Sequence, residues 1–155
     1  MKTSRHDEML DNLELLAGND TFEITVTGYS MLPMLGRGLD TVVVRPCSEQ
    51  ELVAGRIAMF RGDNRRLIVH RIQHRDGNRF IMAGDGNYRK TEQCSLDDIV
   101  GIVDKVIRRN GKIVDCTART WRLRERCWLA TPPICRRYIT AVMRRVLDWK
   151  KRNKK

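Results

Sequence analysis

The spacing of apolar residues along the chain predicts a helix first, then a series of strands, then two more helices. Residues 5–17 carry apolar side chains at helical spacing among acidic ones, which predicts a short amphipathic helix. From Thr21 the period becomes two, because the apolar residues of 22–26 alternate with polar ones, as in a half-buried strand. Asp76-Gly77 and Asn110-Gly111 predict tight hairpin turns. Further strand-like runs are 41–44, 56–60, 67–72, 79–82, 99–103, 106–107 and 113–114.

Many short strands with no helix between them predict a mainly β protein, built as a barrel or a folded sheet. After Asp115 the pattern turns helical and basic, and the prolines of 131–133 divide it into helices over 121–130 and 134–151. The second helix carries one apolar stripe made of Tyr138, Ile139, Val142, Met143, Val146 and Leu147. Its basic residues include Arg136, Arg137, Arg144 and Arg145.

The positive charge of the chain is concentrated at its C-terminal end. With 155 residues, 41% hydrophobic and 32% charged, the chain fits one globular domain with a formal net charge of +11. Residues 1–115 hold 17 basic and 17 acidic side chains, whereas residues 116–155 hold 13 and 2. We therefore divide the chain into an N-terminal helix (1–20), a β domain (21–115) and a basic amphipathic segment (116–155).

Three environments are open to the basic segment. It can pack on the barrel with its arginines in water, lie on an anionic membrane face, or contact a partner or nucleic acid. Its three tryptophans, Trp121, Trp128 and Trp149, slightly favour an interface.

The cysteine and hydropathy patterns favour a cytoplasmic protein without a metal or another cofactor. The five cysteines are an odd number with no C-x-x-C pair, which suggests neither a zinc site nor a complete disulfide framework. The acidic N-terminus lacks the apolar stretch of a signal peptide, and no run approaches the ~18 apolar residues of a membrane span. If the basic segment binds lipid, the protein is peripheral on the inner membrane face.

A serine that follows the first strand is the candidate nucleophile. The stretch 28–33 holds Ser30 between that strand and a glycine-rich turn. A serine hydroxyl needs a neighbouring base that removes its proton as it attacks. His6 lies in the N-terminal helix and His74 precedes a hairpin turn, which leaves His70, inside an apolar strand, as the candidate base. The alternative is a strand-end serine and a buried structural histidine.

Together these blocks resemble the signal peptidase I superfamily, to which the LexA-type self-cleaving repressors are related. The G-x-S-M-x-P pattern around Ser30 matches, and the match continues in order through 40–44, 54–60, 69–72 and 83–87. Bacterial signal peptidases and the repressors use lysine as base, whereas the endoplasmic-reticulum and archaeal type has histidine in a V-H-R-[IV] setting. Val69-His70-Arg71-Ile72 resembles the latter. The chain departs from the family by one inserted residue within 37–40 and by the absence of a membrane anchor ahead of the core.

The resemblance implies a signal-peptidase/LexA-like folded β-barrel that acts as a serine endopeptidase on an extended peptide or a leader sequence. In that mechanism Ser30 attacks the peptide carbonyl, His70 protonates the leaving amine, and the backbone N–H of Ser30 helps to hold the oxyanion.

The resemblance also offers Asp85 as the acid beside His70, because Asp85 matches the family's G-D-x-N block. A two-residue turn at Asp76-Gly77 would pair residue 68 with residue 85 and put Asp85 diagonal to His70 on the same face. A three-residue turn would put them on opposite faces. In the histidine type a second acid further along is the usual orienting group, and that region is 89–93 here.

Two other classes of function stay open. A catalytically silent peptidase-like module would bind a peptide or partner without cleaving it. A LexA-type regulator would need a DNA-binding domain ahead of the strands, and about twenty residues are too few for one. The expected partners are a peptide or protein substrate and an anionic membrane surface at 116–155, and nucleic acid is not expected.

Overall fold

The structure of the protein, a computed structural model, describes residues 21–36 and 38–153. The predicted helix over residues 5–17, with His6, lies outside the described residues. The elements in chain order are β1 (Phe22–Thr25), β2 (Asp40–Arg45), the 3-10 helix η1 (Glu49–Glu51), β3 (Ile57–Arg61), η2 (Asp63–Arg65), β4 (Leu67–Asp76), β5 (Arg79–Gly84), β6 (Asn87–Ser95), η3 (Leu96–Asp98), β7 (Ile99–Arg108), β8 (Ile113–Asp115), α2 (Arg119–Ala130) and α3 (Pro133–Arg152).

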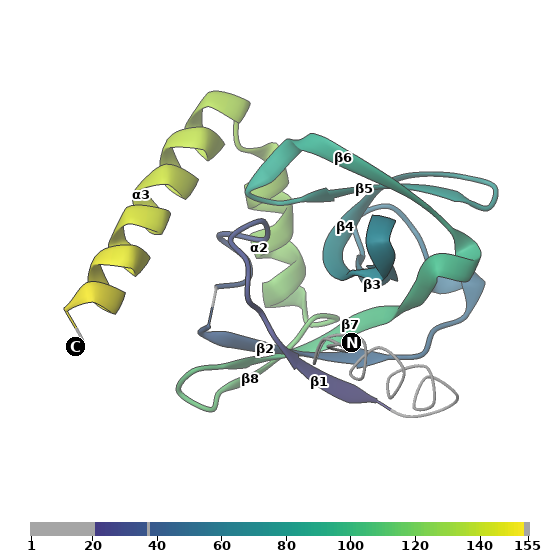
Figure 1. Ribbon diagram of the computed structural model, residues 1–155, viewed down its shortest axis with the longest axis horizontal. Coiled ribbons are helices and arrows are strands. Elements are labelled where there is room, and N and C mark those ends of the chain that lie inside the picture. The colour runs from purple at the N-terminus through teal and green to yellow at the C-terminus, as the bar shows by residue number, and fades with distance from the viewer. Residues whose placement is uncertain (1–20, 37, 154–155) are drawn as a thin grey trace, which may run out of the picture.

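The strands form one antiparallel sheet, which confirms the predicted mainly β class. Their order is β1-β2-β7-β3-β4-β5-β6, and β8 pairs with β7. Figure 1 shows that this sheet is strongly coiled and that the two helices lie together at one side of it. β3 sits between β7 and β4, and its residues 57–60 are all buried, as expected of a central strand. β2 alternates buried and half-buried residues, as the period of two predicts.

The hairpin between β4 and β5 departs from the predicted register. Asp76 pairs with Arg79, so the turn residues are Gly77 and Asn78 rather than Asp76 and Gly77. Gly77 has a φ of 56°, in the left-handed region that favours glycine, and this requirement places the glycine at the first turn position. The register shifts again between Ile72 and His74. Residues 68 and 85 are therefore not paired across this hairpin.

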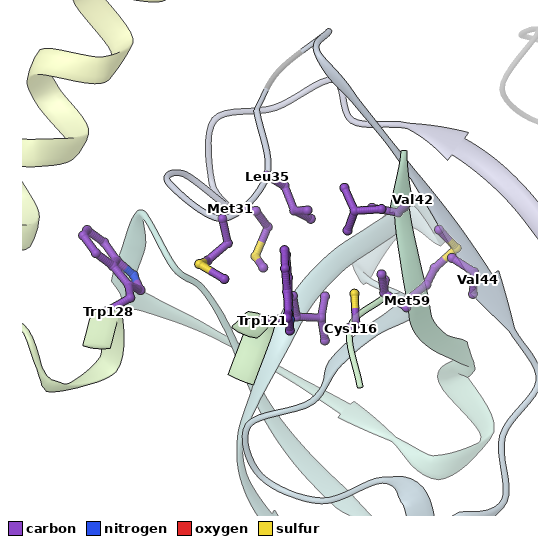
Figure 2. Packing of buried hydrophobic residues seen from close by; sticks show 12 residues of the cluster. Met31, Leu35, Val42, Val44, Met59, Cys116, Trp121 and Trp128 are labelled. Atoms are coloured by element: carbon purple, nitrogen blue, oxygen red, sulfur yellow. The ribbon is translucent and has the colours of Figure 1, made fainter. Parts of the chain in front are cut away.

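The tryptophans of α2 are core residues of the β domain, contrary to the preference for an interface. Trp121 is 1% exposed and Trp128 is 6% exposed. Figure 2 shows the Trp121 ring in the middle of a cluster that includes Cys116 and Met31, with Trp128 at its edge. α2 therefore closes one end of the sheet, and the boundary drawn at residue 116 does not separate the helix from the core.

α3 packs differently from α2. Among the described residues of α3, Thr140 alone is buried, and large apolar side chains along the helix are exposed. Neither helix of the described residues has both the length and the apolar character that a transmembrane segment needs.

Candidate active site

Ser30 lies in a turn that is fixed to the core by the residues that follow it. Met31, Leu32, Met34 and Leu35 are each 2% exposed or less. Burial of each such side chain contributes roughly 1.5–3 kcal/mol, so the turn is held in one place. Backbone bonds from Leu32 N–H to the Tyr29 carbonyl (3.2 Å) and from Leu35 N–H to the Met31 carbonyl (2.9 Å) close it. The half-buried Ser30 is thereby held at the surface of the core.

The turn between β5 and β6 holds Ser30 from its other side. The N–H of Gly86 donates to the Ser30 carbonyl at 2.8 Å. A Cβ added at Gly84 would lie 2.3 Å from the same carbonyl oxygen, closer than the 3.0 Å that real Cβ atoms keep. Only glycine at position 84 therefore lets this turn come so close to the backbone of Ser30.

His70 comes from β4 and reaches the serine directly. Its backbone pairs with Ala58 of the central strand β3, and its ring lies 6.2 Å from the Phe60 ring, centroid to centroid. The distance from His70 Nε2 to Ser30 Oγ is 3.1 Å, within hydrogen-bond reach. The structure thus brings together the two side chains that the sequence singles out, forty positions apart in the chain.

Burial controls the protonation of His70, which is 8% exposed. Burial lowers the pKa of His70 below its usual 6.5, and this effect outweighs the opposite influence of the Glu92 and Asp85 charges. The imidazole is therefore neutral at pH 7, so that it can accept a proton from a hydroxyl.

The carboxylate that faces the other ring nitrogen belongs to Glu92. β6 pairs with β5 at Glu92 and Met82, which points Glu92 toward His70. His70 Nδ1 and Glu92 Oε2 are 3.5 Å apart, and neither buried atom has a hydrogen-bond partner among the described residues. Each buried atom without a partner costs about 1–3 kcal/mol, so a small approach of the two side chains is favourable. Glu92 lies in the region 89–93, where the resemblance to the histidine type implied a second acid, but the sequence alone did not single it out.

Asp85, the acid expected beside His70, binds Arg71 instead. Both its oxygens accept from Arg71, from Nε and from Nη2 at 2.7 Å each. Both side chains are 1% exposed, and such a planar two-bond pair satisfies the buried carboxylate. The changed register of the hairpin explains the difference. It pairs Arg71 with Ala83, and so places Arg71 rather than His70 opposite the end of β5. Asp85 acts on His70 through its charge and not through a hydrogen bond.

Arg71 also connects the site to α2. Its Nη1 donates to the Gly55 carbonyl and to Glu125 of α2, at 2.6 Å in both cases. Trp128 of the same helix donates through Nε1 to the Asp85 carbonyl at 3.3 Å. The turn that holds Ser30 is therefore tied to α2 by both a buried ion pair and a backbone contact.

Comparison with known families agrees with this fold and geometry. A family model described as Peptidase S24-like matches residues 2–113. The chain belongs to the Peptidase S24-like family. This membership confirms, at the level of the superfamily, the predicted relationship to the LexA-type and signal-peptidase-like proteins. A search of curated proteins found no match.

The S24-like domain has an apolar groove beside Ser30. The groove has a volume of about 350 Å³ and is lined by residues 24–28 on one side and 67–69 on the other, with Met31, Leu35, Val42 and Met59 at its base. Among the described residues, β1 is the last strand at its end of the sheet, and the first half of β4 pairs with β3 but not with β5. Within this part of the chain, backbone groups of both walls are thus open to pairing with an extended peptide.

Metal ligands do not gather at this site. Within the described part of the chain, no three His, Cys, Asp or Glu side chains come close enough to hold an ion. His74, four residues after His70, is exposed on the same strand and has no part in the cluster.

Proposed function

We propose that the protein is a serine endopeptidase in which Ser30 is the nucleophile and His70 is the general base. The contact of 3.1 Å between Ser30 Oγ and His70 Nε2 carries this proposal. Oγ forms a bond to the carbonyl carbon of the peptide while its proton passes to Nε2. The same proton then passes to the leaving amine as the C–N bond breaks, and water hydrolyses the acyl ester by the reverse route.

Glu92 orients the base in this mechanism. Nε2 accepts a proton only when the neutral ring carries its hydrogen on Nδ1, and Glu92 Oε2 is the acceptor that faces Nδ1, at 3.5 Å. The carboxylate also stabilises the imidazolium that forms during attack. Glu92 is a positioning residue in our assignment, and Asp85 holds the turn beneath Ser30 through Arg71.

Two further features support acyl transfer at Ser30. Its backbone N–H donates to no acceptor among the described residues, and is available for the oxyanion of a tetrahedral intermediate. The groove accepts an extended peptide as an added strand, with apolar side chains of the peptide against Val42 and Met59. We infer that the substrate presents small or apolar residues next to the cleaved bond.

A fluorophosphonate probe tests the nucleophile without knowledge of the substrate. We expect covalent labelling of the wild-type protein at Ser30, located by mass spectrometry of its peptides. Ser30→Ala removes the attacked atom and His70→Ala removes the base, so both variants lose labelling while their thermal unfolding stays cooperative. Ser48→Ala and His74→Ala are the matched controls, because both residues are exposed and outside the cluster. Labelling of Ser30→Ala at the wild-type rate contradicts the assignment.

A catalytically silent module that binds a peptide is the second candidate. The gap of 3.5 Å between His70 and Glu92, longer than an ordinary hydrogen bond, favours it. In that case the folded wild-type protein binds extended apolar peptides in the groove and leaves the probe unreacted.

A further inference from the structure

The helix α3 turns a polar row of residues toward the rest of the protein. Arg136, Thr140, Arg144 and Asp148 follow one another at four-residue intervals and so share one side of the helix. Thr140 is 7% exposed, and the Arg144 guanidinium lies 5.7 Å from the centre of the Tyr29 ring. Asp148 accepts a hydrogen bond from the Tyr29 hydroxyl, and Arg136 stacks over Trp128 of α2.

The opposite side of α3 is an apolar row that faces away from the protein. Ile134, Tyr138, Val142 and Val146 each precede a member of the polar row by two positions, which is about 200° around a helix. They are 69%, 68%, 58% and 44% exposed. Figure 1 shows α3 standing beside the sheet with its outer side uncovered. A helix of a globular protein ordinarily buries its apolar side, whereas α3 leaves these four residues exposed and only half-buries Met143 and Leu147 of the same stripe.

Positive charges flank the apolar row. Arg137 and Arg145 are exposed next to it, and Lys150, Lys151 and Arg152 continue at the end of the helix. The two acidic residues of 116–155 are already engaged, Glu125 with Arg71 and Asp148 with Tyr29. The surface of α3 is therefore both apolar and strongly cationic.

The combination of exposed apolar residues and positive charges indicates what kind of partner covers α3. A second copy of the chain would bring a second cationic helix against the first, and like charges at close range oppose such a pairing. A surface of anionic lipids accepts apolar side chains between its acyl chains and basic side chains at its phosphates. We propose that α3 binds the protein to an anionic lipid surface, with Ile134, Tyr138, Val142 and Val146 inserted below the phosphates.

The bound orientation places the candidate active site close to the lipid. The polar row of α3 contacts Tyr29, the neighbour of Ser30, and a Cβ at Gly86 would lie 3.4 Å from Thr140 Cγ2. The helix that meets the lipid is thus the helix that touches both turns around the nucleophile. Lipid binding itself does not depend on catalysis, so the inference stands apart from the proposed function.

Co-sedimentation with vesicles tests the proposal on the full chain. We expect the protein to sediment with vesicles of phosphatidylcholine and phosphatidylglycerol and to stay in solution with vesicles of phosphatidylcholine alone. Val142→Glu/Val146→Glu replaces two half-exposed valines and weakens binding about tenfold or more for each substitution. Arg137→Gln/Arg145→Gln weakens it about fivefold for each lost charge.

The matched control changes two exposed apolar residues on other elements. Val53 is 51% and Ile113 is 63% exposed, and Val53→Glu/Ile113→Glu alters the net charge as much as the α3 pair does. This control retains wild-type binding if α3 is the contact surface. Unchanged binding of the α3 valine variant, in protein shown by circular dichroism to be folded, overturns the proposal. Self-association that the same variant abolishes, without any lipid binding, also overturns it in favour of a dimer.

Discussion

Gly84→Ala is the sharpest test of how the fold positions the nucleophile. The added Cβ would lie 2.3 Å from the carbonyl oxygen of Ser30, 2.9 Å from its carbonyl carbon and 3.0 Å from its Cβ. Because all three atoms belong to Ser30, the strain is relieved by a movement of that residue, by about 1 Å, to an ordinary contact distance. A misplacement of that size lowers the reaction rate about 100-fold, because Ser30 Oγ moves out of hydrogen-bond reach of His70 Nε2. We therefore expect the rate of fluorophosphonate labelling to fall about 100-fold in protein that remains folded.

Gly101→Ala is the matched control for this substitution. Its Cβ would lie 2.4 Å from the Arg45 carbonyl oxygen, so it strains the sheet in the same way and away from Ser30. Both variants lose about 1–3 kcal/mol of unfolding free energy, measured by urea denaturation, from overpacking. Only in Gly84→Ala does the labelling rate fall by more than the smaller amount of folded protein explains. Equal rates in the two folded variants would refute the argument that the 84–86 turn sets the position of Ser30.

Three further predictions concern the buried charges. Since the Glu92 charge raises the pKa of His70, Glu92→Gln lowers that pKa, so the acid limb of the labelling rate moves to lower pH while the plateau falls about 10–100-fold. A lower plateau without a shifted limb would mean that Glu92 has a structural role only. Because burial lowers the pKa of folded His70 below 6.5, the unfolded chain binds this proton first, and the unfolding free energy decreases as the pH falls below 6.5. Urea denaturation shows a weaker decrease in His70→Gln, and an unaltered decrease contradicts the assignment. Arg71→Met leaves the Asp85 carboxylate buried without a partner and costs about 3–5 kcal/mol, whereas Glu125→Gln costs about 1 kcal/mol by the same method. Equal losses would contradict the dominance of the Arg71–Asp85 pair.

The family motifs singled out Ser30 and His70, whose side chains the structure brings to 3.1 Å of each other, because such motifs restrict the residue types and their order along the chain. The acid was harder to predict, since its position depends on the register of a hairpin. One position in the turn and one bulge decide whether Asp85 or Glu92 faces His70, and both follow from backbone conformations such as the positive φ of Gly77. Such features arise from the whole sheet, and no local pattern reports them.

The amphipathic pattern of the C-terminal helices had a similar limit. Periodicity predicted an apolar stripe on α3, but a stripe does not say which side meets the domain. The structure divides it, because Tyr138 and Val142 are exposed while Met143 and Leu147 are half-buried. The helix is rotated so that Asp148 contacts Tyr29 and part of the apolar stripe stays in water.

The position of Trp121 and Trp128 has a consequence for biosynthesis. Both rings complete a core whose other members come from the strands, the Ser30 turn and Cys116, and α2 is translated after the entire sheet. A ribosome that stops short of α2 releases a chain with the serine and the histidine but without the wall that holds their loops in register. If the proposed function is right, hydrolytic competence therefore arrives only once α2 has been translated and packed.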